Sequence, residues 1–218
     1  MCLNSVKLST VSLSREKLVS VGLELLDEHG LEGLSLRKLA TELDVQASAI
    51  YWHFKNKQEL LDEMATAMFR RLLTDTEWPQ PRDWRDGLER LGVELRAMLL
   101  SRRDGAKMAA GTYLTDDSLL SSMEIPLRFL TEAGFPLRDA VRAFITVYSF
   151  TVGFTIEEQA VAGDPRYADT ARRSRIDAEK YPLSASAGPE IFGTPDERFE
   201  HGLRVIIAGV GAYASEPR

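Results

Sequence analysis

Cysteine and histidine are scarce in this sequence of 218 residues, and the chain has no long apolar run without charges. The single cysteine, Cys2, excludes an intrachain disulfide and suits a reducing compartment. The longest uncharged stretch of the most apolar segment spans 143–156, which is shorter than the roughly 20 residues of a membrane span. The first residues hold no continuous apolar segment of the kind found in signal peptides. We therefore predict a cytoplasmic protein without a membrane partner.

Patterns typical of β-strands are also missing, because no run of Val, Ile and Thr alternates with polar residues for long enough. We predict an all-α protein with a helix-turn-helix domain at 1–60 and a larger helical domain at 76–218. A connecting helix at about 56–75 and a linker at 77–83, which contains Pro79 and Pro81, join the two. The other expected helices span about 14–29, 36–43, 47–53, 83–99, 106–114, 117–133, 137–162 and 196–213.

Particular side chains mark where the helices begin and end. Ser35, Asn56 and Asp83 carry oxygen atoms that can accept the first backbone N–H groups of a helix, so each is a predicted N-cap. Gly30 is predicted to end the first helix, because glycine tolerates the left-handed conformation of a helix C-terminus. Residues 164–195 are polar and then rich in Pro, Gly, Ser and Ala, and we expect a long mobile loop with one or two helical turns.

Positive charge gathers in one short segment. The net charge of −6 does not favour a general affinity for nucleic acid. Between Gly33 and Gln58, however, four basic residues face two acidic ones. Short helices joined by tight turns have the proportions of a helix-turn-helix, in which the third helix lies in the major groove. The sequence therefore predicts binding to double-stranded DNA through this segment.

The candidate DNA contacts lie on the second and third helices. The second offers basic side chains for phosphates and a hydroxyl at its N-terminus, where N–H groups and the dipole favour an anion. The third offers polar groups for base edges, alanines for a thymine methyl, and a phenol and an ammonium for phosphates. Trp52 is either a DNA contact or a core residue, His53 is either a phosphate contact or a structural histidine, and Ile50 and Phe54 are expected in the core. The candidates are Ser35, Arg37, Lys38, Gln46, Ala47, Ser48, Ala49, Tyr51, Trp52, His53 and Lys57.

Residues 18–65 resemble the DNA-binding domain of the TetR family, most clearly through EGLSLRKLA at 32–40 and IYWHFKNKQELLD at 50–62. The rest of the chain resembles the tetracycline repressor branch of that family, with its motifs in the same order. These motifs are LLSRRDGAK at 99–107, Gly111-Thr112, FTVG at 150–153, Glu157, Gln159 and FEHGL at 199–203. The resemblance covers nearly the whole chain.

The resemblance implies a homodimeric transcriptional repressor that binds a palindromic operator and is released by a small-molecule effector. Helices at about 137–162 and 196–213 would form the four-helix bundle of the dimer, and their apolar faces fit such packing. Effector binding would move the helix after the recognition helix, so that the two recognition helices no longer match successive major grooves. Arg103 and Asp104 would couple the effector site to that helix. The alternative is an ordinary surface turn, with Gly105 as a helix break.

The chain departs from the tetracycline repressors where they bind a magnesium-chelated drug. By the resemblance, Ala109 replaces the metal-ligating histidine, Leu73 the other pocket histidine and Leu91 an asparagine. Thr112 and Glu157 match positions that act on the metal through water, but without an imidazole they would hold a cation only weakly. We expect no metal, no cofactor and a mostly apolar effector. The candidate pocket residues are Leu73, Leu91, Leu95, Ala109, Thr112, Tyr113, Leu114, Val141, Phe144, Tyr148 and Glu157.

Several alternatives stay open at this point. The pocket leucines could equally be ordinary core residues. A regulator of the same fold could bind DNA only with its ligand, or could activate transcription. A helical dimeric adaptor that binds only protein is the alternative from another class, and the SLRKLA and IYWHFKNK segments argue against it. An enzyme is disfavoured, because Glu157 and Glu158 are adjacent on a helix and do not share a face; no catalytic residues are predicted.

Ala47-Ser48-Ala49 replaces Gln-Pro-Thr of the tetracycline repressors, so the operator should differ from theirs.

Overall fold

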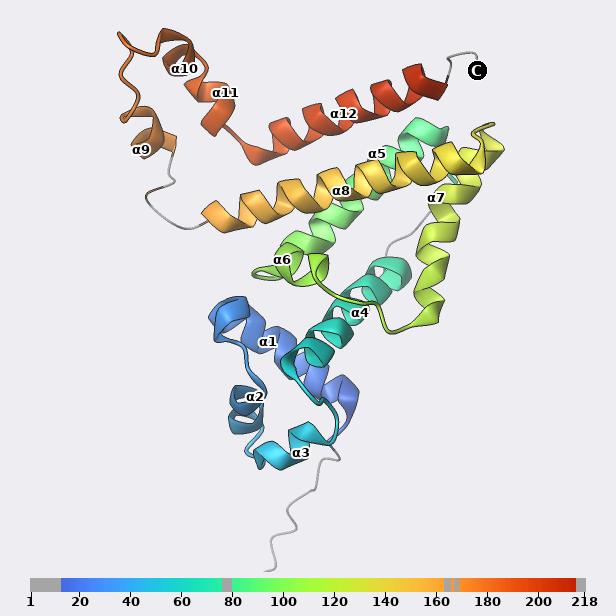
Figure 1. Ribbon diagram of the computed structural model, residues 1–218, viewed down its shortest axis with the longest axis vertical. Coiled ribbons are helices and arrows are strands. Elements are labelled where there is room, and N and C mark those ends of the chain that lie inside the picture. The colour runs from blue at the N-terminus through green and yellow to red at the C-terminus, as the bar shows by residue number, and fades with distance from the viewer. Residues whose placement is uncertain (1–12, 76–79, 163–165, 167–168, 215–218) are drawn as a thin grey trace, which may run out of the picture.

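The computed structural model describes residues 13–75, 80–162, 166 and 169–214, and every regular element among them is a helix (Figure 1). Helices α1 (Arg15–Gly33), α2 (Leu36–Glu42) and α3 (Ala47–Tyr51) form a cluster at one end. Helix α4 (Lys57–Asp75) leads from this cluster into the larger helical body. The predicted all-α class is confirmed. None of the described helices is long and apolar enough to span a membrane.

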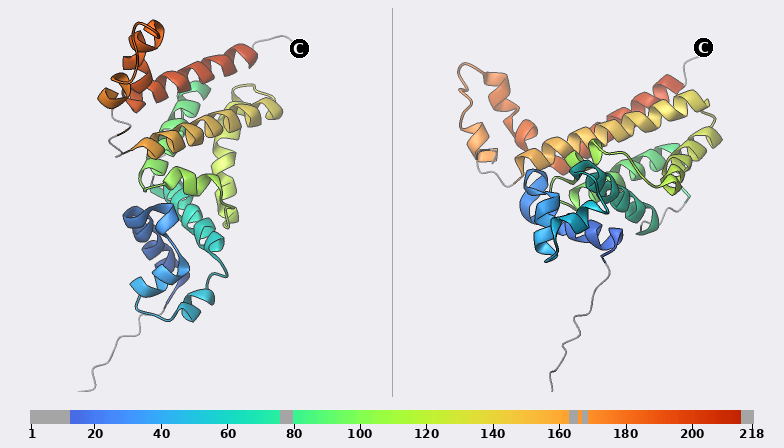
Figure 2. Two further views of the ribbon diagram at one scale, coloured as in Figure 1. Left: turned by 60° about the vertical axis from the view of Figure 1, so that its left-hand side comes forward. Right: turned by 60° about the horizontal axis from the view of Figure 1, so that its bottom comes forward.

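The larger body is built around α5 and α8. It contains α5 (Trp84–Leu100), α6 (Gly105–Ala110), a 3₁₀ turn at Asp117–Leu120, α7 (Ser121–Glu132), α8 (Leu137–Val161) and α12 (Pro195–Ala214). Helix α8 packs against α5, α6, α7 and α12. Helices α8 and α12 lie side by side and form the outermost layer, on the side far from α1–α3 (Figures 1 and 2). This layer and the α1–α3 cluster therefore occupy opposite ends of the molecule.

The predicted caps explain where the helices begin. The Ser35 hydroxyl accepts the Lys38 N–H at 3.1 Å, Asn56 Oδ1 accepts the Glu59 N–H at 2.9 Å, and Asp83 Oδ1 accepts two N–H groups of α5. Gly30 has a φ of +70° and a ψ of 175°, so the helix breaks there as predicted, although one more turn follows it before Leu34. These caps are local contacts, which is why the sequence alone indicates them.

Two predicted helix boundaries are wrong, and one predicted loop contains more helix than expected. The third helix ends at Tyr51, not at about His53. The helix expected at 106–114 ends at Ala110, because Tyr113 and Thr115 bond to side chains of α4 instead of continuing the helix. The stretch 164–195 was expected to be a long loop with one or two helical turns, and its described part contains three short helices, α9 (Asp169–Arg173), α10 (Pro182–Ser186) and α11 (Gly188–Phe192). Residues 77–79 of the linker expected before α5, and Cys2, lie outside the described residues.

One apolar core joins the α1–α3 cluster to the larger body. Leu18, Leu26, Ile50 and Phe54 are fully buried in it with residues of α4. Met108 of α6, which is 1% exposed, packs into the same core. Because burying a side chain of this size contributes about 1.5–3 kcal/mol, Met108 stabilises the packing of α6 against the core shared by α1–α4.

Candidate DNA-binding surface and internal cavity

The turn between α2 and α3 sets the angle between these two helices. Asp44 adopts a left-handed φ of 51°, and the Val45 N–H returns to the Ala40 carbonyl at 3.0 Å. A polar residue such as Asp tolerates this conformation better than a bulky one. The turn directs α3 across the end of the molecule farthest from α8 and α12 (Figure 1).

Exposure along α3 separates its two faces. Ile50 and Phe54 are completely buried, whereas Tyr51 is 49% exposed and Trp52 is 89% exposed. A tryptophan so exposed makes almost no contribution to the core, which rules out the structural alternative for Trp52. Four of the other candidates are exposed, namely Ser35, Arg37, Gln46 and Ser48. The remaining five are half-buried, namely Lys38, Ala47, Ala49, His53 and Lys57. The candidate DNA contacts thus lie on an accessible surface, with an apolar core behind it.

Arg15 of α1 holds the connection between α3 and α4 in place. Its guanidinium donates to the His53 carbonyl at 2.7 Å and to Glu63 at 2.8 Å, and it lies 4.6 Å from the centre of the Phe54 ring. The backbone of His53 therefore has a structural role. Arg15 was not among the predicted site residues, because nothing in its own sequence neighbourhood indicates a contact 38 positions away.

Lys57 lies at the first turn of α4, but its ammonium is engaged within the chain. Nζ donates to the Leu31 carbonyl at 2.6 Å, in a half-buried position. The N–H of the same residue, Leu31, donates to Asp104 Oδ2 at 2.8 Å. One peptide segment near the end of α1 is therefore held from both sides, by α4 and by the turn before α6. An ammonium has three N–H donors, and this bond uses one of them.

The turn at Arg102–Asp104 forms hydrogen bonds and an ion pair with the end of α1. Arg103 donates its backbone N–H to Asp27 and its guanidinium to the Glu28 carbonyl at 2.9 Å, and Arg102 pairs with Asp27. Asp104 has a left-handed φ of 55°, and a Cβ placed on Gly30 would lie 2.8 Å from its carboxylate. The glycine therefore lets the turn approach closely. Arg103 and Asp104 join the larger body to α1 and, through Leu31, to Lys57.

A cavity of about 370 Å³ lies between α4, α5, α7 and α8. Its wall is almost entirely apolar, and none of the described residues that line it is charged. The polar side-chain atoms are the hydroxyls of Tyr148, Ser122 and Ser149. Burial raises the pKa of the Tyr148 phenol, so this group stays neutral and can donate a hydrogen bond. The C-terminal part of α4 supplies Phe69, Leu72 and Leu73 to the wall.

The predicted pocket residues divide between this cavity and its surroundings. Those that line it are Leu73, Leu91, Leu95, Leu114, Phe144 and Tyr148. Ala109 is buried nearby in the core without lining the cavity, and the Thr112 hydroxyl bonds to the Ala109 carbonyl at 2.9 Å. Tyr113 is 76% exposed, and Val141 and Glu157 also lie outside the lining. The cavity therefore lends no support to these five as ligand contacts.

Helix α7 forms a wall of the cavity that sequence reasoning missed. Ser122, Met123, Ile125, Pro126 and Phe129 all line it. The amphipathic pattern of α7 shows that one face is apolar, but it cannot show whether that face meets another helix or an empty volume. Within the described part of the chain, no group of three or more His, Cys, Asp and Glu side chains is placed to hold a metal ion.

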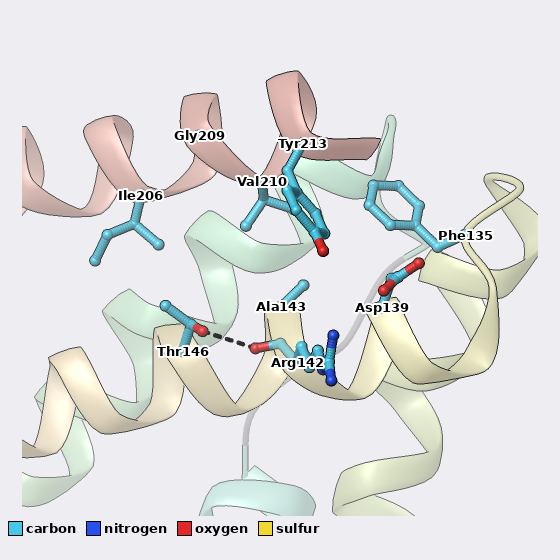
Figure 3. A pocket seen from close by; sticks show the side chains of 9 residues that line it. All are labelled: Phe135, Asp139, Arg142, Ala143, Thr146, Ile206, Gly209, Val210 and Tyr213. Carbon is cyan, nitrogen blue, oxygen red and sulfur yellow. Dashed lines mark hydrogen bonds between the residues drawn. The ribbon is translucent and has the colours of Figure 1, made fainter. Parts of the chain in front are cut away.

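A second, more open hollow of about 310 Å³ lies between α8 and α12 (Figure 3). Ala143 and Thr146 of α8 face Ile206, Val210 and Tyr213 of α12, and Phe135 closes one end. The Thr146 hydroxyl bonds to its own helix, at the Arg142 carbonyl. A Cβ placed on Gly153 or Gly209 would meet nothing within 4 Å, and Val205 is 57% exposed. The outer face of these two helices thus combines apolar side chains with open space.

Together, the exposed α3 surface and the cavity reached by α4 define a helix-turn-helix regulator with an internal ligand-sized cavity. Residues 18–64 match the family model described as bacterial regulatory proteins, tetR family, and residues 78–213 match that of the tetracyclin repressor-like C-terminal domain. The chain therefore belongs to the TetR family of transcriptional regulators.

Individual relatives agree with this assignment. The tetracycline repressor protein class C of Escherichia coli is 40% identical over 202 residues, which are 91% of this chain and 90% of that protein. A possible TetR family regulator from Streptomyces coelicolor A3(2) has a crystal structure with a TM-score of 0.82 and 38% identity, covering 92% of this chain and 100% of that one. ActR from Streptomyces coelicolor, solved in complex with actinorhodin, has a TM-score of 0.79 and 28% identity, covering 94% and 99%.

Proposed function

We propose that this repressor binds a palindromic operator as a homodimer and leaves it when a mostly apolar small molecule occupies the cavity. The observation that carries this proposal is the course of α4, which begins beside the exposed α3 surface and ends in the cavity wall at Phe69, Leu72 and Leu73. A ligand that prefers a different position of this end of α4 also changes the position of its beginning. Coupling of this kind is typically worth about 1–3 kcal/mol.

The two predicted domains have different proposed roles. Residues 1–60 read DNA through the candidate contacts of α2 and α3, residues 76–218 bind the ligand and the second copy, and α4 connects them. The regulator acts in the cytoplasm, where its operator is, and it catalyses no reaction. Arg103 and Asp104 couple the two units through α1 and Leu31.

The cavity wall supports an uncharged, mostly apolar ligand that binds without a metal or other cofactor. An ionised ligand would lose its hydration without gaining an opposite charge, because the described side chains of the wall offer only hydroxyls as polar contacts. ActR was solved with actinorhodin, and a class A tetracycline repressor with 5a,6-anhydrotetracycline and magnesium. The wall of this cavity suits binding without magnesium, because Leu73 and Leu91 offer no ligand atom for a metal.

The outer layer of α8 and α12 supports the dimer. Its apolar residues, including Val205 and those around the hollow in Figure 3, would be covered by the same helices of a second copy. A two-fold arrangement of this kind presents two α3 helices to successive major grooves, which requires a palindromic site.

Operator binding is tested with the DNA upstream of the protein's own gene. Fluorescence anisotropy with this duplex and with a scrambled duplex of equal length should show specific binding that weakens steadily as salt increases, because phosphate contacts release counterions. Equal binding to both duplexes, or none at low salt, would exclude the proposed operator function.

The ligand is tested by thermal shift and anisotropy with actinorhodin and 5a,6-anhydrotetracycline, each in magnesium and in EDTA. We expect a stabilising ligand to act equally in both buffers and to release the duplex. Stabilisation that strictly requires magnesium would contradict the metal-free cavity. A ligand that strengthens duplex binding would show that it acts as a co-repressor.

A further inference from the structure

Helix α3 is too short to fix its own direction. It contains only the residues Ala47–Tyr51, whereas isolated helices need about 12–15 residues to be even marginally stable in water. The side chain of its N-cap residue, Gln46, forms no capping bond within the described part of the chain, and Ile50 is the one buried residue of the helix. The backbone of the turn after α2 holds its N-terminal end. The direction of α3 therefore also depends on what holds its C-terminal end.

That C-terminal end is held by a side chain of α1. The N–H groups of His53 and Phe54 both donate to the Ile50 carbonyl, at 2.9 and 3.0 Å, and this closes the last turn. The next carbonyl in need of a donor is that of His53, and it accepts the Arg15 guanidinium. The exposed Tyr51 lies in the same short stretch. A long-range side-chain contact thus fixes the part of α3 that carries candidate DNA contacts.

Arg15 uses both the edge and the face of its guanidinium. Nη1 donates to the His53 carbonyl at 2.7 Å, and Nη2 donates to Glu63 Oε1 of α4 at 2.8 Å. The guanidinium carbon lies 4.6 Å from the centre of the buried Phe54 ring. A guanidinium is planar and presents its donors in a rigid fork, whereas a lysine ammonium is a point charge on a flexible stem. The plane of Arg15 therefore relates the backbone after α3 to both α1 and α4.

A basic side chain at this position could instead be an ordinary phosphate contact. Its charge alone would then matter, and pairing with Glu63 would weaken it. Two observations favour a positioning role, because two N–H groups of Arg15 are already engaged within the chain and its plane rests on a buried ring. Lys17 provides a comparison, since it is an exposed basic residue of the same turn of α1 and has none of these contacts.

We propose that Arg15 and Glu63 are positioning residues for DNA reading, which set the direction of α3 and thereby the discrimination of the operator from other sequences. This rests on the proposed function, since it takes operator binding by α3 as given. Hydrogen bonds to base edges require a precise geometry, so a small rotation of α3 removes them. Phosphate contacts carry no sequence information, and flexible side chains can keep them after the same rotation.

The test measures discrimination, defined as the Kd for the scrambled duplex divided by the Kd for the upstream duplex. Both duplexes bind the same folded protein. Partial unfolding of a variant therefore raises both Kd values by the same factor and leaves their ratio unchanged. A purely structural role of Arg15 would lower the Tm without lowering the discrimination.

The variants separate geometry from charge. Arg15→Met keeps a long side chain beside Phe54 and removes every N–H donor, whereas Arg15→Lys keeps the charge and loses the planar fork. Arg15→Met combined with Glu63→Gln removes one charge of each sign, so the net charge near the DNA is preserved. Glu63→Gln alone covers the case in which the Arg15 variants fail to fold. Lys17→Met is the matched control, because it removes a positive charge from the same turn of α1.

We expect discrimination to fall about tenfold in Arg15→Met, in Arg15→Lys and in the double variant, an effect comparable to one mismatched base pair. Glu63→Gln should lower it in the same direction. Lys17→Met should change it by less than about twofold, because a lost phosphate attraction affects both duplexes alike. The salt dependence of the double variant should equal that of wild type, because no phosphate contact is lost.

Three results would overturn the positioning role and leave the proposed function intact. Discrimination that is fully retained in Arg15→Lys would show that the charge alone matters. Tighter binding of Glu63→Gln to both duplexes would identify Arg15 as a phosphate contact that Glu63 restrains. Wild-type discrimination in the double variant would show that the pair does not direct α3. Equal binding of the wild-type protein to both duplexes would overturn the proposed function, and the positioning role with it.

Discussion

Trp52 and Phe54 are two aromatic residues, two positions apart, with opposite environments. Trp52 is 89% exposed, whereas Phe54 is completely buried beside Arg15, in the core that the α1–α3 cluster shares with α4. Trp52→Ala should leave the free energy of unfolding within about 0.5 kcal/mol of wild type, because it removes almost no packing. It should nevertheless weaken operator binding by about tenfold if it is a direct contact worth about 1–3 kcal/mol.

Phe54→Ala is the contrasting variant for the same measurements. Its side chain fills the core, so we expect a loss of about 3–5 kcal/mol in stability. Urea denaturation gives the stability and fluorescence anisotropy gives the operator affinity. If Trp52→Ala binds the duplex as tightly as wild type, Trp52 is an exposed residue without a role in DNA binding.

Single residues also show where prediction from sequence reaches its limit. Ile50 and Phe54 were predicted to be buried, and are, because their spacing marks an apolar face. The bond from Lys57 to the Leu31 carbonyl could not be predicted, since it joins residues 26 positions apart through the packing of α1 on α4. The same holds for Arg15 and Gln159, whose partners lie on other elements.

At the scale of elements, Gly30 controls how closely the Arg102–Asp104 turn approaches α1. Its backbone, at φ +70° and ψ 175°, lies in a region that is essentially restricted to glycine. Gly30→Ala adds this strain to a contact of 2.8 Å with the Asp104 carboxylate. We expect a loss of about 1–3 kcal/mol in stability and a weaker link between the turn and α1.

Gly111→Ala is the control for this prediction. Gly111 has a φ of −105°, and nothing lies within 4 Å of a Cβ placed on it. Thermal denaturation should show a clear decrease in Tm for Gly30→Ala and almost none for Gly111→Ala. Equal Tm values for the two variants would mean that the left-handed break of α1 does not limit stability.

The elements divide into those that local sequence specifies and those that depend on tertiary contacts. Helices α2, α4 and α5 begin at predicted caps because Ser35, Asn56 and Asp83 bond within their own first turn. Residues 112–114 were wrongly predicted to be helical, because Asp62 and Thr66 of α4 satisfy the backbone of this segment in another conformation. Six predicted residues line the cavity, but the contribution of α7 depends on where that helix packs.

For the whole molecule, the proposed function requires two copies joined through α8 and α12. Val205 is 57% exposed on α12 and is not part of the core between α8 and α12, so a charge there should not harm the folded monomer. In the dimer it would be buried without a partner, which is strongly unfavourable. Val205→Asp should therefore give monomers in light scattering, with helical content unchanged in circular dichroism.

Loss of the dimer should also remove most of the operator affinity. Two linked α3 helices bind a palindrome about 10²–10⁴ times more tightly than one, because the second binding event is intramolecular. We expect Val205→Asp to lose at least about a hundredfold in affinity for the upstream duplex. Val93→Asp on α5 provides the control, since Val93 is 43% exposed but lies outside the α8–α12 face. A Val205→Asp protein that remains dimeric would place the subunit interface on another surface, and the spacing of its two α3 helices would then have to be derived anew.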